Sequence, residues 1–179
     1  MRAILPRMND KTHTEHRLSL GEVLDLLLAD GLVVAEDVTA LKEERKRYTE
    51  KIHPLVVVAD QKWRNAKLPA RLLTIEVLSE WMANQVGLPY MHIDPLKIDF
   101  SGVGDVMSSA YATRFSILPV QVTANEVVVA TAEPYLREWE RELAPILRKD
   151  IRRVMASPAD IERYLVEFFN LAKSVKKAA

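Results

Sequence analysis

The first half of the chain carries hydrophobic residues at the period of an α-helix. In the segment LGEVLDLLLADG, aliphatic residues recur at i, i+3, i+4, i+7 and i+8, which is the stripe that a helix buries on one side. Ser19 precedes this stripe as an N-cap, and Gly31 follows it as a C-terminal stop. The pattern therefore predicts a helix between these two residues.

Weaker helical patterns fill the rest of the first half. The segment AEDVTALKEERKRYTEKI combines a narrow apolar side with a charged remainder, and we expect Pro54 to end it. The run PLVVVADQKW fits either a short strand or a buried helix, of which we favour the helix. A further apolar stripe starts after Thr74 and stops at Gly87. These segments predict an all-helical unit.

Beyond Phe100 the pattern becomes mixed. After a helix expected over about 105–115, the runs ILPVQVT and EVVVATA are rich in β-branched residues and predict a hairpin around the turn-like ANE. DIRRVMA predicts a third strand. Proline at the first helical position predicts two further helices, which open at Glu133-Pro134 and Ser157-Pro158. The predicted fold class is α+β, with an N-terminal helical subdomain followed by a small three-stranded α/β subdomain.

These changes in pattern divide the chain into five parts. They are a flexible arm (1–16), a helical subdomain (17–87), a connecting segment (88–104), an α/β subdomain (105–170) and a basic linker (171–179). Within the connecting segment, His92, Asp94 and Asp99 raise the alternative of a metal or acid–base group. We favour a hinge in which Asp94 caps the turn at Pro95, since the segment lies where the composition changes.

Composition and charge narrow the classes of function. The chain has 179 residues, of which 49% are hydrophobic, with 25 basic and 25 acidic residues. Residues 1–87 hold 13 of each sign and residues 88–179 hold 12 of each, so neither half has the basic excess of a nucleic-acid-binding domain. The absence of cysteine excludes disulfides and thiolate metal sites. We expect a cytoplasmic protein without membrane insertion, because neither a secretory signal nor a run of about 20 apolar residues is present.

Sequence signatures of catalysis are not found. The phosphate-binding pattern GxxxxGK[ST], the zinc-binding pattern HExxH and the serine-nucleophile pattern GxSxG are all absent from the sequence. We therefore predict no catalytic residue, no metal site and no enzyme activity for this chain.

The apolar stripes of the first half have two interpretations. Such a stripe is either packed into the core, which is the more common case, or presented to a partner protein. The residues that would contact a partner are Leu20, Leu24, Leu27, Leu28, Val38 and Leu41.

Three segments carry a resemblance to a known family. They are GLPYMHIDPLKIDF, YATRFSILPVQVTANEVVVATAEP and IRRVMASPADIERYLVEFF, and they extend from about Gly87 to Phe169. In this order they resemble the N-terminal domain of the type II secretion and type IV pilus assembly ATPases of bacteria. The first half of the chain is similar to that domain in outline.

The resemblance implies a docking domain with no catalytic role. In that family the domain precedes a hexameric ATPase and recruits it to the inner membrane by binding the cytoplasmic part of a membrane protein. The implied partners are therefore the cytoplasmic domain of an inner-membrane secretion-platform protein and a C-terminal ATPase module, to which residues 171–179 would lead. The implied location is cytoplasmic and peripheral to the inner membrane.

Some members of that family bind cyclic di-GMP through a motif that begins Arg-Leu-Gly and has a second glycine seven residues after the first. Here a serine follows Arg17-Leu18, and the two glycines lie ten residues apart. The three extra residues change the register, which argues against this ligand, because bare glycine backbone is what lets N–H groups approach a phosphate. We expect no other cofactor in this chain. The positions to test are Arg17, Leu18, Gly21, Gly31 and Leu32.

Overall fold

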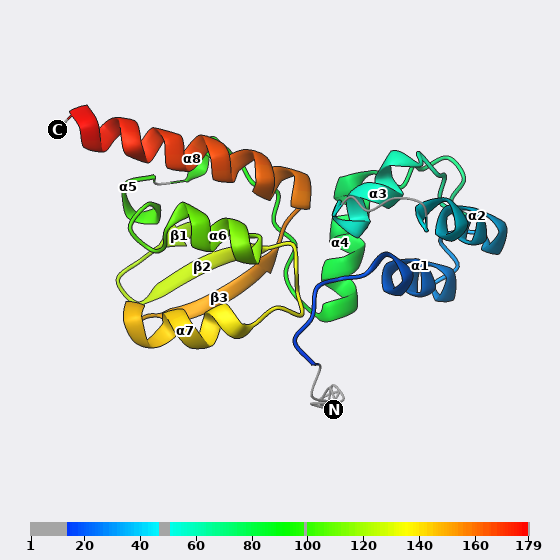
Figure 1. Ribbon diagram of the computed structural model, residues 1–179, viewed down its shortest axis with the longest axis horizontal. Coiled ribbons are helices and arrows are strands. Elements are labelled where there is room, and N and C mark those ends of the chain that lie inside the picture. The colour runs from blue at the N-terminus through cyan, green and yellow to red at the C-terminus, as the bar shows by residue number, and fades with distance from the viewer. Residues whose placement is uncertain (1–13, 47–50, 99, 179) are drawn as a thin grey trace, which may run out of the picture.

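The computed structural model describes residues 14–46, 51–98 and 100–178 (Figure 1). These residues form two bodies side by side, a helical one from the first half of the chain and a sheet-containing one from the second half (Figure 1). The predicted α+β organisation is confirmed. None of the helices in the described part of the chain has both the length and the apolar character that crossing a bilayer requires.

Short helices build the first body. They are α1 (Leu20–Ala29), α2 (Ala35–Arg45), α3 (Pro54–Asp60) and α4 (Ile75–Val86). Two of the predicted caps are present, since the hydroxyl of Ser19 accepts a backbone N–H of α1 at 3.2 Å and that of Thr74 accepts one of α4 at 3.3 Å. Gly31 and Gly87 follow these helices with φ of +69°, the left-handed conformation that glycine adopts without a steric penalty.

Pro54 starts a helix and does not end one, contrary to the prediction. Its missing N–H is harmless at the first helical position, and Nδ1 of His53 accepts the N–H of Leu55 at 3.2 Å as an N-cap. The first seven residues of the run PLVVVADQKW are therefore helical, as favoured from the sequence, and the last three follow the helix. The preceding helix α2 stops at Arg45, and residues 47–50 of the longer predicted helix lie outside the described residues.

The second body is a three-stranded sheet with helices around it. After the 3₁₀ turn η1 (Pro95–Lys97), its elements are α5 (Phe100–Val103), α6 (Ser109–Phe115), β1 (Ile117–Val122), β2 (Glu126–Thr131), α7 (Glu138–Leu147), β3 (Asp150–Met155) and α8 (Pro158–Ala178). β1 and β2 form the predicted antiparallel hairpin, and β3 lies parallel to β2 on its other side. In the view of Figure 1 the sheet lies between α8 and α7.

Each body has its own hydrophobic core. The first is built by buried side chains of the four helices, among them Val23, Leu24, Leu27, Val38, Leu41, Leu55, Leu78 and Met82. The second is built by the sheet and by α6, α7 and α8, among them Ile117, Leu118, Val127, Val129, Trp139, Ile161 and Phe168. Met155, at the end of β3, is buried among the residues of the first core, so the two bodies meet there.

The connecting segment, for which we predict a hinge, contacts both bodies. Residues 89–91 pair with the end of β3, where the N–H of Met91 donates to the carbonyl of Met155 and the N–H of Met155 donates to that of Pro89, both at 2.8 Å. Farther along, Ile93 and Ile98 are buried in the second core. The segment therefore extends the contact between the two bodies.

Three other boundaries differ from the prediction. α6 starts at Ser109 and not near residue 105, because the Ser108 hydroxyl caps it by accepting a backbone N–H at 3.2 Å. α7 starts at Glu138, since residues 134–135 form a turn. α8 begins at Pro158 as predicted but continues to Ala178, so residues 171–178, expected to be a linker, are helical.

Candidate functional site

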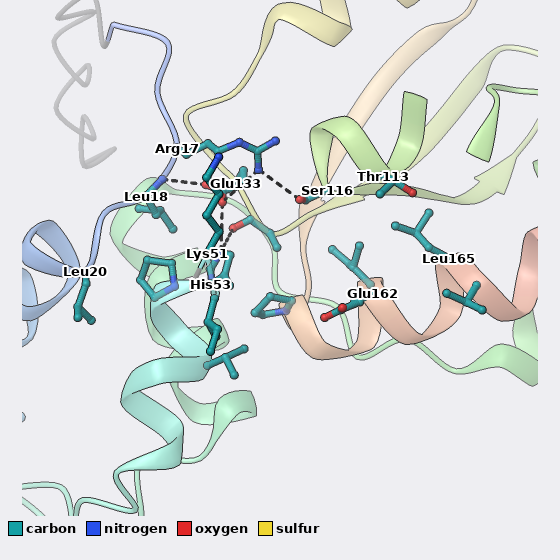
Figure 2. Close-up of a pocket in the computed structure, with 17 residues that line it drawn as sticks. Arg17, Leu18, Leu20, Lys51, His53, Thr113, Ser116, Glu133, Glu162 and Leu165 are labelled. Atoms are coloured by element: carbon teal, nitrogen blue, oxygen red, sulfur yellow. Dashed lines mark hydrogen bonds and ion pairs between the residues drawn. The ribbon is translucent and has the colours of Figure 1, made fainter. Parts of the chain in front are cut away.

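A cleft of about 880 Å³ lies between the two bodies (Figure 2). Its walls come from the segment before α1, the start of α3, the turn between α6 and β1, the end of β2 and the first turns of α8. The volume is that of a typical binding pocket for a small molecule or a few side chains. Most of the lining is apolar, and the polar side chains include Arg17, Lys51, His53, Ser116, Glu133 and Glu162.

The carboxylate of Glu133 lies at the centre of the polar contacts in this cleft (Figure 2). Its side chain follows β2 and is almost completely buried, with 3% of the residue exposed. One oxygen accepts the backbone N–H of Leu18 at 2.8 Å, and the other lies 3.7 Å from Nη1 of Arg17 and 3.6 Å from Nε2 of His53. Glu133 thereby joins the end of β2 to two segments of the first body.

Burial raises the pKa of Glu133 above that of a free glutamic acid. The N–H of Leu18 and the charge of Arg17 act in the opposite direction without cancelling the effect of burial. An isolated carboxylate at this depth would be strongly disfavoured, so these two partners are what allow an ionised Glu133 in the cleft.

His53 is kept neutral by burial and is positioned by two hydrogen bonds. Because Nδ1 accepts the N–H of Leu55, the ring proton is placed on Nε2, which donates to the carbonyl of Ala132 at 2.9 Å. Burial lowers the pKa of His53 to about 4, which the bond to Ala132 opposes and the charge of Arg17 reinforces. His53 therefore acts as a hydrogen-bonding link between the two bodies at neutral pH.

Arg17 extends across the cleft to the second body. Its guanidinium donates to the Ser116 hydroxyl at 3.4 Å and also to the carbonyl of Arg114. Both acceptors lie at the C-terminal end of α6, where a cation is favoured by the helix dipole. Half of the Arg17 side chain remains exposed, at 51%.

Glu15 and His16 bind the second body just before this point. The carboxylate of Glu15 accepts the N–H groups of Arg137 and Glu138, at 2.8 and 3.1 Å, at the start of α7 and lies 2.7 Å from Nη2 of Arg141. Burial alone would raise the pKa of Glu15, but these donors outweigh it and lower the pKa. The ring of His16 stacks on Tyr135 with 4.8 Å between centroids.

We call residues 15–18 the strap, since all four of them contact the second body. Residues 1–13 of the predicted flexible arm lie outside the described residues, whereas Glu15 and His16 are fixed by the contacts above. The strap, the start of α3 and the connecting segment together hold the two bodies in one arrangement.

Comparison with known proteins decides the family. Residues 86–175 match the MshEN domain, which is half of the chain. This chain belongs to the MshEN domain family. The match covers the second body and the connecting segment, the part in which the sequence motifs indicated the resemblance.

A curated protein similar to this chain is a pilus assembly ATPase. The type IV pilus assembly ATPase TfpB of Acinetobacter baylyi is 34% identical over 157 residues, which cover 85% of this chain and 26% of TfpB. The chain therefore spans about a quarter of the length of that relative.

Two solved structures share the fold of both bodies. The structure of MshE with cdg has a TM-score of 0.54 at 17% identity and covers 85% of this chain and 99% of that one. The N-terminal domain of XpsE has a TM-score of 0.51 at 16% identity, with coverage of 86% and 98%. The chain thus has the fold of MshE and of the N-terminal domain of XpsE, as expected from the motifs.

The structure does not bring all five positions considered for cyclic di-GMP together. Arg17 and Leu18 lie at the cleft, and Gly21 lies in the first turn of α1. Gly31 and Leu32 follow the other end of α1, a helix of 10 residues and therefore about 15 Å long. The structure brings the first two together and keeps the last two apart from them.

Most of the candidate partner-binding residues are in the core. Leu24 and Leu27 are 0% exposed, and Val38 and Leu41 are nearly as buried, so these four do not form a binding surface. The reason is that α1 packs its apolar stripe against the other helices of the first body. Leu20 lines the cleft and Leu28 is 38% exposed, which leaves these two accessible.

The two described residues of the alternative group in the connecting segment, His92 and Asp94, have separate partners. Nδ1 of His92 lies 3.9 Å from Asp160, and the His92 side chain is 70% exposed. Asp94 caps the turn at Pro95 by accepting the N–H of Leu96 at 3.0 Å, as favoured from the sequence. Asp99 lies outside the described residues, within which no cluster of histidines and carboxylates suits a metal ion.

Sequence reasoning missed three residues of the cleft and the strap: Glu133, His53 and Glu15. The sequence predicts a helix start at Glu133-Pro134, although an acid two residues after a buried strand is also a signal for a buried polar contact. His53 could have been found from Pro54, because a proline at the first position of a helix makes the residue before it the N-cap. The position of Glu15 at α7 depends on a contact 122 residues away, for which no local signal exists.

Proposed function

We propose that this chain is a non-catalytic docking and regulatory domain of a type II secretion or pilus assembly ATPase. It recruits the motor to the inner-membrane platform by binding the cytoplasmic domain of a platform protein. The observation that supports this most is the match of 85% of the chain to 26% of a pilus assembly ATPase. The ATPase activity would belong to another part of that protein, and the location would be cytoplasmic and peripheral to the inner membrane.

The packing of the two bodies supports a role in which the position of a partner bound to one body determines the position of whatever is attached to the other. The strap, Met155 and the buried pair of Glu133 and His53 join them through hydrogen bonds and a shared core. A partner bound to one body is thereby held in a defined orientation relative to the other, from which α8 extends.

A pull-down tests the docking function. The full ATPase and this chain are each presented to the purified cytoplasmic region of the inner-membrane protein of the same system. Both are expected to retain it. Absence of binding by both would contradict the proposal.

Cyclic di-GMP sensing is a second candidate for the same machinery. It is favoured by the shared fold with MshE, which was solved with cdg, the abbreviation we take for cyclic di-GMP, and by the half-exposed Arg17 at the cleft. The separation of Gly31 and Leu32 from Arg17 argues against it.

Calorimetry with cyclic di-GMP distinguishes this candidate. If the chain binds the nucleotide through the cleft, Arg17→Ala removes the heat of binding, whereas Arg163→Ala on the exposed side of α8 retains it. No heat with the unsubstituted chain eliminates the candidate.

A further inference from the structure

The loop between α3 and α4 concentrates unpaired positive charge. Between Asp60 and Glu76 the sequence has four basic residues and no acidic one, although the chain as a whole is neutral. All four side chains are exposed, and within the described part of the chain no carboxylate lies within 4 Å of them. These residues are Lys62, Arg64, Lys67 and Arg71.

Many cations elsewhere on the surface have an acidic partner. Lys42 lies 2.7 Å from Asp25, and Arg163 lies 3.2 Å from Glu167. Such pairs neutralise their own field, whereas the four cations of residues 61–72, which we call the basic loop, leave a local positive potential.

The basic loop also exposes aliphatic side chains among its cations. Leu68 is 53% exposed and Leu72 is 43% exposed. The loop is joined to the α1–α2 turn, where Val34 is 45% exposed, by a hydrogen bond of 2.9 Å from the N–H of Ala66 to the carbonyl of Leu32. Apolar surface surrounded by charge is the composition of a protein–protein contact.

Hydrogen bonds fix the conformation of the basic loop. The carboxamide oxygen of Asn65 accepts the N–H groups of Lys67 and Leu68 at 2.9 and 3.2 Å, and the N–H of Asn65 donates to the carbonyl of Arg71 at 2.8 Å. Below it, Gly31 leaves room for the stem of Lys67, whose Cε would lie 3.0 Å from a β-carbon at that position. Because the loop is already ordered, a partner would bind it without a large entropic penalty.

The basic loop lies away from the cleft. In Figure 1 the connection between α3 and α4 is beside α2, at the end of the molecule opposite to the C-terminal end of α8. A partner bound there would leave the cleft and α8 uncovered.

We propose that the basic loop is the docking surface for an acidic protein partner, one that presents carboxylates around an apolar patch. This inference rests on the proposed docking function and names the partner's surface chemistry. The carboxylates pair with the four cations, and the apolar patch covers Leu68 and Leu72. A protein surface fits better than a lipid bilayer, because both leucines keep about half of their area against the domain and do not project fully into the solvent.

A titration with matched variants tests this proposal. The full chain is titrated with the purified cytoplasmic region of the inner-membrane protein at low and high salt. Lys67→Glu combined with Arg71→Glu is expected to weaken binding at least tenfold and to reduce its salt dependence, because the attraction becomes repulsion. Leu68→Ser is expected to weaken binding with unchanged salt dependence. Lys173→Glu with Lys177→Glu on α8, an equal change of charge, is expected to alter the affinity less than twofold.

The outcomes separate this proposal from the docking function. No binding by either the unsubstituted chain or the full ATPase contradicts both. Circular dichroism checks that the loop variant is folded. If the folded loop variant binds as tightly as the unsubstituted chain, only the role of the basic loop is contradicted. The same conclusion follows if the α8 variant loses as much affinity as the loop variant. Loop-dependent binding to phosphatidylglycerol vesicles with unchanged binding to the protein also overturns it.

Discussion

At the scale of single residues, the contact between the bodies depends on groups whose charge is controlled by burial. Glu133 reaches Arg17 and the strap backbone, and His53 reaches Ala132 as a neutral ring. These contacts satisfy the buried polar atoms, since the described residues include no buried side-chain nitrogen or oxygen without a partner. Both groups therefore link the two bodies through hydrogen bonds and charge.

The first prediction concerns His53 and acid. Its pKa is about 4 in the folded chain and 6.5 when unfolded, so between these values the unfolded chain binds the proton more strongly. The contribution of His53 is fully present above pH 6.5 and is lost as the pH falls towards 4. At about 1.4 kcal/mol per pKa unit, the loss is up to about 3 kcal/mol. Urea unfolding between pH 7 and pH 4 measures it.

The control for this prediction is His53→Gln, whose amide N–H can still donate to the carbonyl of Ala132. This variant is expected to lose less stability on acidification than the unsubstituted chain. The raised pKa of Glu133 acts in the opposite sense, because its folded state gains a proton more readily, so the comparison between the two chains is what isolates His53. Parallel stability curves for both chains would show that His53 is not the group that titrates.

The second prediction concerns Arg148, which follows α7. Its φ of +51° places a side chain in the left-handed region, and it is exposed. Arg148→Gly removes that steric penalty and also removes a cation that is favourable near the helix end. Because the first effect is the larger, the free energy of unfolding is expected to increase by about 0.5–1 kcal/mol. The free energy of unfolding in urea reports it. A decrease in stability would mean that the Arg148 side chain contributes more than its backbone conformation costs.

At the scale of elements, the stripe of α1 has a structural role. Leu24 is completely buried in the first core, whereas Leu28, one turn farther on, is 38% exposed. The third prediction is that Leu24→Ala lowers the free energy of unfolding by about 2–5 kcal/mol and Leu28→Ala by less than about 1 kcal/mol. Similar losses in thermal or urea unfolding would contradict the burial of only one side of α1.

The elements were predictable where a local signal determines them. The caps at Ser19 and Thr74, the glycine stops, the hairpin and the proline start of α8 all depend on residues within a few positions. Errors occurred where one residue is compatible with two structures, as at Pro54, which can end one helix or start the next. The contacts of the strap with Glu133 and α7 join residues more than 100 positions apart, so the sequence alone did not predict the cleft.

At the scale of the whole molecule, the strap determines how the two bodies lie together. Glu15 binds the start of α7, and Leu18 binds Glu133. The fourth prediction concerns Glu15→Gln, which replaces the charged acceptor of three donors by a neutral one. This change is expected to weaken the contact by about 1 kcal/mol. Backbone hydrogen exchange is expected to become faster in residues 14–18 and at the start of α7, and to stay unchanged in the core of α4. Unchanged exchange in the strap would contradict its role.

Recruitment of a motor to the membrane is the central claim, and cell fractionation measures it most directly. The full ATPase is compared with a form that lacks this domain, each in cells with and without the inner-membrane platform protein. We predict that the ATPase is found in the membrane fraction only when both the domain and the platform protein are present. An equal share in the membrane fraction after removal of the domain would contradict the account.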